Sequence, residues 1–299
     1  MSAGAASTRG AHAQEVQSGK RFEFGKNWAS FLRVLDETRI ESARRSLATM
    51  LGTDDLRGRR FLDVGSGSGL SSLAAHRMGA DVVSFDYDPA SVACTTELRR
   101  RYGGDAARWS VQQGSALDQQ FVRSLGQFDV VYSWGVLHHT GSMWQALDIV
   151  TGAAAPGGTL FIAIYNDQGA WSGRWTRIKR FYCSGPVGRT VVSAAFIPYW
   201  VVRNFAADLV WLRNPAARYI GYGRERGMSV VHDWSDWLGG YPFEVAKPEQ
   251  ILDFYLARGF ALRRLTTCGG SVGCNEFVLT RVEPASTTRP RTLPAGPTF

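Results

Sequence analysis

Residues 61–72 read FLDVGSGSGLSS and decide the architecture of this chain. A short apolar run ends at Val64, glycines follow at positions 65, 67 and 69, and Leu70 begins a segment of helical character. Glycine allows a sharp turn and a close approach to a ligand, and the first turn of a helix offers unpaired N–H groups to an anion. The stretch therefore predicts a strand, a ligand-binding turn and a helix, which together open a parallel α/β sheet.

The spacing of these glycines bears on the ligand. A dinucleotide-binding loop has the pattern G-x-G-x-x-G, whose third glycine would stand at position 70, where this chain has Leu70. The observed pattern is G-x-G-x-G. It counts against a nicotinamide cofactor, but it leaves that alternative open because a glycine loop alone is weak support for any ligand.

Strand-like runs and helical segments alternate on both sides of the loop, which predicts βαβ units and a mostly parallel sheet. Toward the C-terminus, residues 248–258 read as a helix, and the two closely spaced strands after it predict a hairpin that gives the parallel sheet an antiparallel edge. The expected strands are 59–64, 80–85, 107–112, 128–134, 158–165, 261–266 and 276–281, and the helices between the first five are 70–78, 89–102, 121–125 and 143–154.

A long interruption separates the fifth strand from the helix at 248, although such connections commonly take only a few residues. We therefore expect an insertion with its own structure. The resulting organisation is a mobile N-terminal tail (1–18), a helical lid (19–55), a ligand-binding core (56–167), a helical insertion (168–247), the C-terminal part of the core (248–282) and a mobile C-terminal tail (283–299).

The composition excludes several classes of protein. With 44% hydrophobic and 20% charged residues over 299 positions, the chain reads as globular rather than disordered, collagen-like or coiled-coil. Its four cysteines have no CxxC spacing and predict neither a disulfide framework nor a metal site. Residues 1–20 carry no apolar signal segment, so the expected location is the cytoplasm.

The net charge of +8 is concentrated in one part of the chain. Residues 168–230 hold ten arginines and lysines against Asp208 and Glu225, and the rest of the chain is neutral in aggregate. A solvated basic face and an attraction to phosphate groups on a substrate or a lipid both fit this distribution. No aromatic stacking platform or recognition helix accompanies it, so we expect no nucleic-acid partner.

Residues 191–212, VVSAAFIPYWVVRNFAADLVWL, are apolar enough to suggest a membrane. Pro198, Arg203 and Asp208 argue against a simple span, because charges at bilayer depth are costly. Three interpretations are open: a helical cap packed on the domain, a cap that also touches a membrane surface, and a true span. One face of the expected helix would carry Ile197, Val201, Phe205, Leu209 and Leu212.

Two carboxylates follow strands at the same expected edge of the sheet. Asp63 precedes the glycines, where it can face an ammonium group, and Asp86 ends the second strand, where it can accept hydrogen bonds from both ribose hydroxyls. A ligand with an ammonium, a carboxylate, a ribose and an adenine but no pyrophosphate is S-adenosylmethionine (SAM). The sequence therefore predicts SAM as cofactor, S-adenosylhomocysteine (SAH) as product, and no metal.

With these features the chain resembles the class I SAM-dependent methyltransferases. LDVGSGSG (62–69) looks like their first motif, Asp86 like their acidic second motif, and FDVVYSWGVLHH (128–139) like their fourth-strand motif. The resemblance covers residues 56–165 and the final helix and strand pair. It implies a Rossmann-like α/β fold with a mostly parallel seven-stranded sheet, an antiparallel C-terminal hairpin strand and a helical insertion after strand 5.

The resemblance also implies parts for individual residues. The glycine loop would pass beneath the methionine part of SAM, Asp86 and Tyr87 would lie at the ribose and adenine, and Trp134 would help to close the site under the sulfonium. Many relatives have an aspartate where this chain has Ser115, which puts a direct acidic contact to the adenine amino group in question. The implied cofactor-binding set is Asp63, Gly65, Ser66, Gly67, Gly69, Asp86, Tyr87, Ser115, Ala116, Ser133 and Trp134.

Methyl transfer to a hydroxyl needs the acceptor held in line and its proton removed. The candidate catalytic residues are His139 after the fourth strand, Asp167 after the fifth, and His232 and Asp233 after the apolar insertion. A histidine is the first choice because its ordinary pKa lies near neutrality. For His139 a loop-closing role is the alternative, since the sequence LHH recurs in methyltransferases of unrelated substrates.

The expected function is methylation of a small molecule, at a hydroxyl oxygen of a lipid-linked, aromatic or anionic biosynthetic intermediate. The chain is similar in this respect to methyltransferases of quinone biosynthesis and of polysaccharide or secondary-metabolite pathways. The alternatives are an N- or C-methyltransferase of a natural product, an NAD(P)-dependent oxidoreductase, and a catalytically silent membrane-associated binding protein. A peripheral membrane contact through 191–212 is an open alternative to a purely cytoplasmic protein, and the oligomeric state is not set by the sequence.

Overall fold

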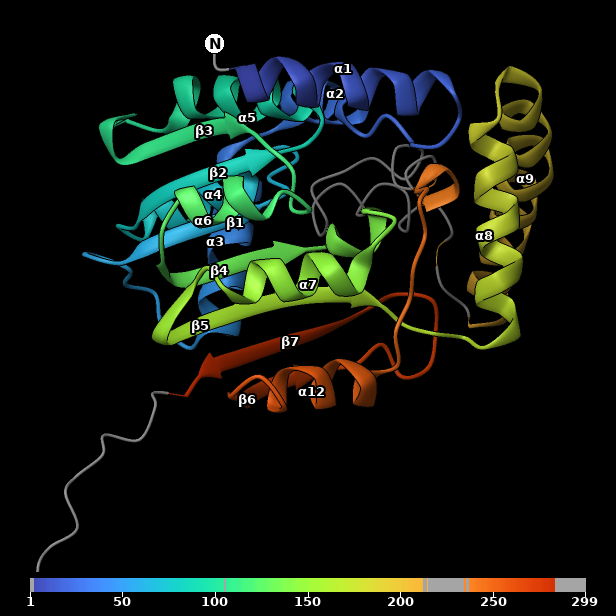
Figure 1. The fold of residues 1–299 in the computed structure, drawn as a ribbon. Helices are drawn as coiled ribbons and strands as arrows, with labels where there is room; N and C mark the ends of the chain where they lie inside the picture. Colours follow the sequence, from blue (N-terminus) through green and yellow to red (C-terminus); the bar gives the residue numbers. More distant parts are fainter. Residues whose placement is uncertain (1–2, 105, 212–213, 215–233, 235–236, 283–299) are drawn as a thin grey trace, which may run out of the picture.

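The computed structural model describes residues 3–104, 106–211, 214, 234 and 237–282. Its centre is a seven-stranded sheet of order β3-β2-β1-β4-β5-β7-β6 (Figure 1). The first five strands pair in parallel, and β7 runs antiparallel to both β5 and β6. The strands are β1 (Arg60–Val64), β2 (Asp81–Asp86), β3 (Trp109–Gln113), β4 (Phe128–Trp134), β5 (Ala154–Tyr165), β6 (Phe260–Thr266) and β7 (Cys274–Arg281).

This sheet confirms the predicted fold class, including the antiparallel C-terminal strand. The hairpin differs from the expectation in one respect, because β7 lies inside the sheet and β6 forms its edge. The fifth strand also begins at Ala154 rather than at residue 158, since Ala154 pairs with Phe128 before a register shift in the β4–β5 ladder.

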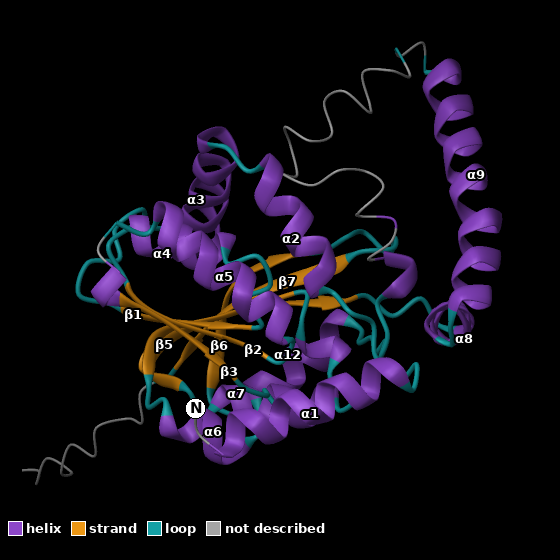
Figure 2. Ribbon diagram, turned by 90° about the horizontal axis from the view of Figure 1, so that it is seen from above, coloured by secondary structure: helices purple, strands orange, loops and turns teal. Residues whose placement is uncertain are grey.

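Helices cover both faces of the sheet (Figure 2). Side chains alternate between the faces along a strand, so Phe61 of β1 joins the core under α3, α4 and α5, whereas Leu62 joins the core under α6, α7 and α12. The helices of the core are α2 (Gly25–Val34), α3 (Glu37–Leu51), α4 (Leu70–Arg77), α5 (Pro89–Tyr102), α6 (Gln119–Ser124), α7 (Met143–Thr151) and α12 (Pro248–Leu256).

The carboxyl ends of β2 and β3 lead into helices that begin at acidic caps. The Asp88 side chain accepts a hydrogen bond from the Ala90 N–H, and Pro89 stands at the first position of α5. The Asp118 side chain caps α6 in the same manner. These caps fix where α5 and α6 start, and with them the loops that follow β2 and β3.

Residues Ala3–Gln17 form the helix α1, whereas the sequence predicts a tail over 1–18. The helix has no amphipathic pattern, which is why the sequence does not signal it. Tertiary contacts accompany it instead: the His12 ring packs edge-on against Tyr87, with ring centroids 5.3 Å apart. The expected C-terminal tail, 283–299, lies outside the described residues.

The insertion after β5 is helical, as predicted, and contains α8 (Ala170–Cys183) and α9 (Pro186–Val210). Both views put these helices together, on the side to which the carboxyl ends of the parallel strands point (Figures 1 and 2). They share a small core with Phe22 and Leu238. Among the described residues, none of the helices combines the length and the apolarity that a bilayer crossing requires.

The buried face of α9 is not the face that the sequence pattern suggests. Large rings decide the packing: Phe196 lies 5.2 Å from Trp175 of α8, and Trp200 lies 5.3 Å from Trp237, between ring centroids. Of the expected face, Ile197 is partly buried and Leu212 lies outside the described residues. The other three, Val201, Phe205 and Leu209, are exposed.

Candidate functional site

A cavity of about 1060 Å³ opens at the carboxyl ends of β1, β2 and β4. The loops after these strands form its floor, α1, α2 and α3 contribute one wall, and the turn between β6 and β7 contributes another. The sequence-predicted residues that line it are Asp63, Gly65, Ser66, Gly67, Asp86, Tyr87, Ser115, Ala116, Trp134 and His139. The structure therefore brings most of the expected site together.

The glycine loop has a backbone that only glycine adopts easily. Gly65, Gly67 and Gly69 have φ angles of 79°, 53° and 82°. A Cβ on Gly65 would lie 2.3 Å from Cγ1 of Val136, and a Cβ on Gly67 would lie 3.1 Å from the Trp28 indole of α2. The loop is thus a tight cradle packed against helix α2.

Internal hydrogen bonds hold this cradle. The N–H groups of Gly65 and Ser66 donate to the Phe85 carbonyl at the end of β2, and the Gly67 N–H donates to Asp86. The sequence pattern suggests unpaired amides in the first turn of the helix, and the amides of 65–67, in the loop before it, are used to shape the loop. The loop can therefore contribute its concave backbone surface to a ligand rather than these N–H groups.

Asp63 is a buried carboxylate without a cationic partner among the described residues. Its side chain accepts a hydrogen bond of 2.5 Å from Ser72 Oγ. Burial raises its pKa to about 7, and the nearby Asp86 charge acts in the same direction. An ammonium group of a ligand, such as that of SAM, would supply a positive charge beside this carboxylate.

Asp86 lies one strand away with its carboxylate held by the backbone. Oδ2 accepts from the Gly67 N–H and Oδ1 from the Asp88 N–H, each at 2.9 Å. A carboxylate has about four acceptor positions, so both oxygens keep capacity for ribose hydroxyls. Burial raises the pKa of Asp86 to about 6. Together with the cradle and Asp63, this carboxylate fits an amino-acid-bearing nucleoside.

Three other predicted cofactor residues line the cavity and contact their neighbours; they are Tyr87, Ser115 and Trp134. Gln113 Nε2 donates to the Tyr87 carbonyl, which ties the end of β3 to Tyr87. Ser115 Oγ accepts from the Leu117 N–H and so shapes the loop after β3. Trp134 is half-exposed, and its indole N–H donates to Glu276 of β7 at 2.8 Å.

Two predicted cofactor residues do not line the cavity. Ser133 is fully buried and donates to the Val64 carbonyl at 3.0 Å, so its hydroxyl joins β4 to β1. Gly69 caps α4, and its missing Cβ makes room for Thr95 of α5. The two residues support the site from behind. The alternation of side chains along a strand is what turns Ser133 away from the cavity.

The catalytic candidates separate in the structure. His139 lines the cavity, and its Nδ1 lies 2.6 Å from the Pro242 carbonyl oxygen. Burial lowers its pKa to about 3. Asp167 does not line the cavity, because its Oδ1 accepts from the Gly169 N–H and from Ser172 Oγ at the start of α8. His232 and Asp233 lie outside the described residues.

Several lining residues were not singled out from the sequence, whether they lie inside a motif or outside one. Tyr132 of β4 accepts a hydrogen bond from Ser71, and burial raises its pKa. Glu276 and Arg39 are charged residues of the lining, and the aromatic wall of the cavity consists of Trp28, Tyr132 and Trp134. A polar residue near the carboxyl end of a strand could have indicated Tyr132, whereas Arg39 and Glu276 belong to α3 and β7, which carry no motif.

Comparisons with known proteins point in the same direction as the geometry. Residues 62–160 match the family described as a methyltransferase domain. The ubiquinone biosynthesis O-methyltransferase of Methylococcus capsulatus is 31% identical over 111 residues, which are 37% of this chain and 45% of that protein. That of Azorhizobium caulinodans is 28% identical over 140 residues, which are 45% of this chain and 53% of that protein. The chain spans about half the length of the relatives that it matches.

One solved structure to which this chain is similar is that of magnesium protoporphyrin IX methyltransferase from Synechocystis with SAH bound. It has a TM-score of 0.48 and 13% sequence identity, and the alignment covers 82% of this chain and 84% of that chain.

The family match runs from β1 to the middle of β5 and includes the glycine loop and Asp86. The match therefore favours a methyltransferase over the NAD(P)-dependent oxidoreductase that the glycine spacing left open. Since the strands that it spans are those whose carboxyl ends form the cavity, this chain carries a class I SAM-dependent methyltransferase domain.

Proposed function

We propose that this protein methylates a hydroxyl oxygen of a small-molecule acceptor. The observation that carries the proposal is one continuous cavity, in which the buried carboxylate of Asp63, with no cationic partner among the described residues, and the cradle at Gly67 adjoin an aromatic wall and His139. When bound, SAM supplies a methyl group activated by a sulfonium. The cavity has room for an acceptor beside it, because about 1060 Å³ exceeds what a cofactor of this size fills.

The chain's own task is to orient the acceptor and accept its proton. In the transfer, an oxygen lone pair forms the new C–O bond, the bond from the methyl carbon to sulfur breaks, and its electron pair stays on sulfur. In-line displacement needs the oxygen at about 3 Å from the methyl carbon. Trp28, Tyr132 and Trp134 offer flat surfaces that can hold an aromatic acceptor in that line.

His139 is the proposed proton acceptor. A carbonyl oxygen can only accept, so the contact with Pro242 keeps a proton on Nδ1 and leaves the lone pair on Nε2. Because burial lowers its pKa, the ring is neutral at physiological pH, so Nε2 can accept the hydroxyl proton, and the same shift makes it a weaker base than a free imidazole. Arg21 holds the His139 carbonyl at 2.9 Å and so fixes the loop.

The test is methyl transfer from SAM to phenols with and without an alkyl chain or a carboxylate. His139→Gln should lower kcat by about 10²- to 10⁴-fold, the usual contribution of a general base, with unchanged SAH affinity. The control is His76→Gln: this histidine of α4 bonds the Gly103 carbonyl and does not line the cavity. If the turnover of His139→Gln is unchanged, His139 is not the proton acceptor, and the loop-closing role is the interpretation that remains for this residue. Methylation of amines or carbons in place of phenols would favour the N- or C-methyltransferase alternatives.

We further propose that α8 and α9 rest on an anionic membrane surface, which suits a lipid-linked acceptor. A stripe along α9 faces outward, opposite its buried rings: Val187 is 73% exposed, Phe205 52% and Leu209 63%. Val191 and Val202 belong to the same stripe at helical spacing. An exposed apolar stripe of this kind is typical of a surface that meets a partner or a membrane.

Charge favours a lipid surface over a protein partner. The exposed charged side chains of the described stretch 169–211 are all basic, and its one carboxylate, Asp208, is buried. Arginines near a membrane are attracted by anionic headgroups. The exposed basic residues are Arg174, Arg177, Arg180, Arg189 and Arg203.

Vesicle sedimentation tests this second proposal. The protein should bind vesicles of phosphatidylglycerol mixed with phosphatidylcholine, and pure phosphatidylcholine much less. Val202→Ser combined with Phe205→Ser should release it without changing SAH affinity. Val282→Ser is the matched control, since Val282 is 55% exposed but lies at the end of β7, outside the insertion. A concentration-dependent dimer in place of vesicle binding would assign the stripe to a second copy of the chain.

A further inference from the structure

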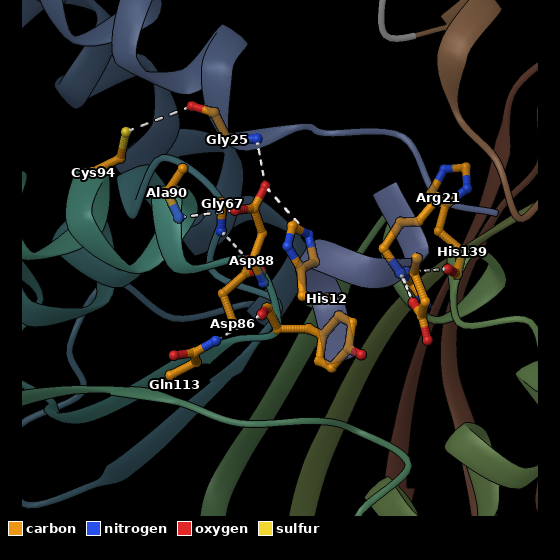
Figure 3. A network of polar contacts seen from close by, with 12 residues as sticks. His12, Arg21, Gly25, Gly67, Asp86, Asp88, Ala90, Cys94, Gln113 and His139 are labelled. Carbon is orange, nitrogen blue, oxygen red and sulfur yellow. Dashed lines mark hydrogen bonds and ion pairs between the residues drawn. The ribbon is translucent and has the colours of Figure 1, made fainter. Parts of the chain in front are cut away.

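Helix α1 brings a buried histidine to the nucleoside end of the cavity. His12 is 5% exposed and lines the cavity together with Tyr87 and Asp88. These two residues follow Asp86, which the fit to SAM puts at the ribose. Figure 3 shows His12 beside Asp86 and Asp88, although it comes from a part of the chain far away in sequence.

The ring nitrogen Nε2 of His12 has no hydrogen-bond partner among the described residues. Its nearest acidic group is Asp88, whose Oδ2 lies 3.9 Å away, beyond hydrogen-bond distance. The Asp88 carboxylate is already used, because it accepts from the Gly25 and Ala90 N–H groups at 2.8 Å each. A buried polar atom in this state costs free energy unless a ligand satisfies it.

The ring is suited to a neutral polar ligand. Burial lowers the pKa of His12, against the opposing influence of the Asp88 charge, so the neutral imidazole prevails at physiological pH. A neutral imidazole has one nitrogen that donates and one that accepts. It can therefore bond a sugar hydroxyl or an amino group, and it would not attract a phosphate.

Arg21 fixes α1 in place over this end of the cavity. Its Nε donates to Glu15 of α1 at 2.5 Å, and another nitrogen donates to the His139 carbonyl at 2.9 Å. Its guanidinium carbon also lies 4.8 Å from the centre of the Tyr87 ring. Arg21 thus connects α1 to the loops after β2 and β4, which form part of the cavity wall (Figure 3). These contacts fix the position of α1, and with it that of His12.

We propose that His12 is a further residue of the cofactor site and that its Nε2 hydrogen-bonds the nucleoside part of SAM. The inference rests on the proposed use of SAM by this chain. In this arrangement α1 covers the nucleoside, α2 covers the glycine loop, and the amino-acid part of the cofactor faces Asp63. The N-terminal region that carries no sequence motif would then supply a direct contact to the cofactor.

The test compares SAH with 5′-methylthioadenosine, which has the same nucleoside but lacks the amino-acid part. Calorimetry is done on the full chain. His12→Ala should weaken both ligands by the same factor, about five- to tenfold, as expected for one lost hydrogen bond. Asp63→Asn should weaken SAH only. His12→Gln keeps a polar nitrogen and should restore most of the affinity.

Gln14→Ala is the matched control, because Gln14 is an exposed residue of the same helix. It should bind both ligands as the unchanged protein does. Equal affinities in His12→Ala and in the unchanged protein would overturn the proposal, and so would a loss confined to SAH. A loss shared by Gln14→Ala would assign the effect to the helix and also overturn it. If the unchanged protein binds neither ligand, the proposed function itself fails, whatever His12 does.

Discussion

The cofactor end of the core and the α8–α9 insertion are built in opposite ways. Around the glycine loop, polar groups are buried and bonded: Asp63 bonds Ser72, and Asp86 bonds two backbone amides. On α9, apolar side chains such as Leu209 face outward. The two regions are therefore suited to bind different kinds of partner. The polar cradle fits a cofactor, and the exposed apolar stripe of α9 is the surface that we propose for contact with a membrane.

The largest expected difference between the two regions is in stability. Leu62 is fully buried in β1, and Leu209 is 63% exposed on α9. Leu62→Ala should lower the free energy of unfolding by about 2–5 kcal/mol, because it leaves a cavity, and Leu209→Ala by less than about 0.5 kcal/mol. Urea denaturation of both variants measures this. A large loss in Leu209→Ala would mean that the stripe packs within the protein and would break the comparison.

The glycine loop gives the next effect. Gly65→Ala adds a Cβ at a φ of 79° and 2.3 Å from Val136, whereas Gly58→Ala adds one at a φ of 72° with no atom within 4 Å. The unfavourable φ costs each variant about 1–2 kcal/mol. Gly65→Ala should lose more than this and should also lose SAH binding. Calorimetry and urea denaturation of the pair separate the effect of φ from that of the clash.

The pH dependence follows from the raised pKa of Asp63. The folded value is about 7 against 3.8 for the free group, so the folded state binds more protons between these values. The stability of the free protein should therefore fall as pH rises through this window, by up to about 1.4 kcal/mol per pH unit. SAH affinity should rise over the same window, because the ammonium needs the ionised carboxylate. Asp63→Asn should flatten both profiles, and a pH-independent affinity in the unchanged protein would contradict this placement of the ammonium.

Ser133 offers the smallest effect. Its hydroxyl is buried and bonds the Val64 carbonyl, away from the cavity. Ser133→Ala should lower the free energy of unfolding by about 1 kcal/mol and leave SAH affinity unchanged. A weakened SAH complex, measured by calorimetry, would restore the role that the fourth-strand motif implies for this residue.

The mostly parallel sheet and the cofactor loops could be predicted because their causes are local. Alternation of strands and helices gives a parallel sheet, and parallel strands bring their carboxyl ends to one edge, so Asp63 and Asp86 had to meet. Ser133 shows the limit of this reasoning. It stands at the end of the correct strand, but the direction of its side chain depends on the strand's register with β1 and β5.

The N-terminal helix was beyond reach of the sequence pattern. Helix α1 has no apolar stripe, and His12 and Arg21 link it to loops more than 60 residues away. The expected pattern on α9 failed for a related reason. Both faces of that helix are apolar, so periodicity alone does not say which one meets Trp237.

By itself the sequence determined the sheet, the glycine loop and the two carboxylates at its edge, because each depends on residues adjacent in the chain. Only the tertiary structure decided that α1 closes over the cavity, that His139 faces the Pro242 carbonyl, and that α9 turns its apolar stripe outward. These outcomes depend on pairs of side chains far apart in sequence. Each of them is favoured because it has a lower free energy than alternative packings of the whole chain, and the pattern of neighbouring residues does not encode that difference.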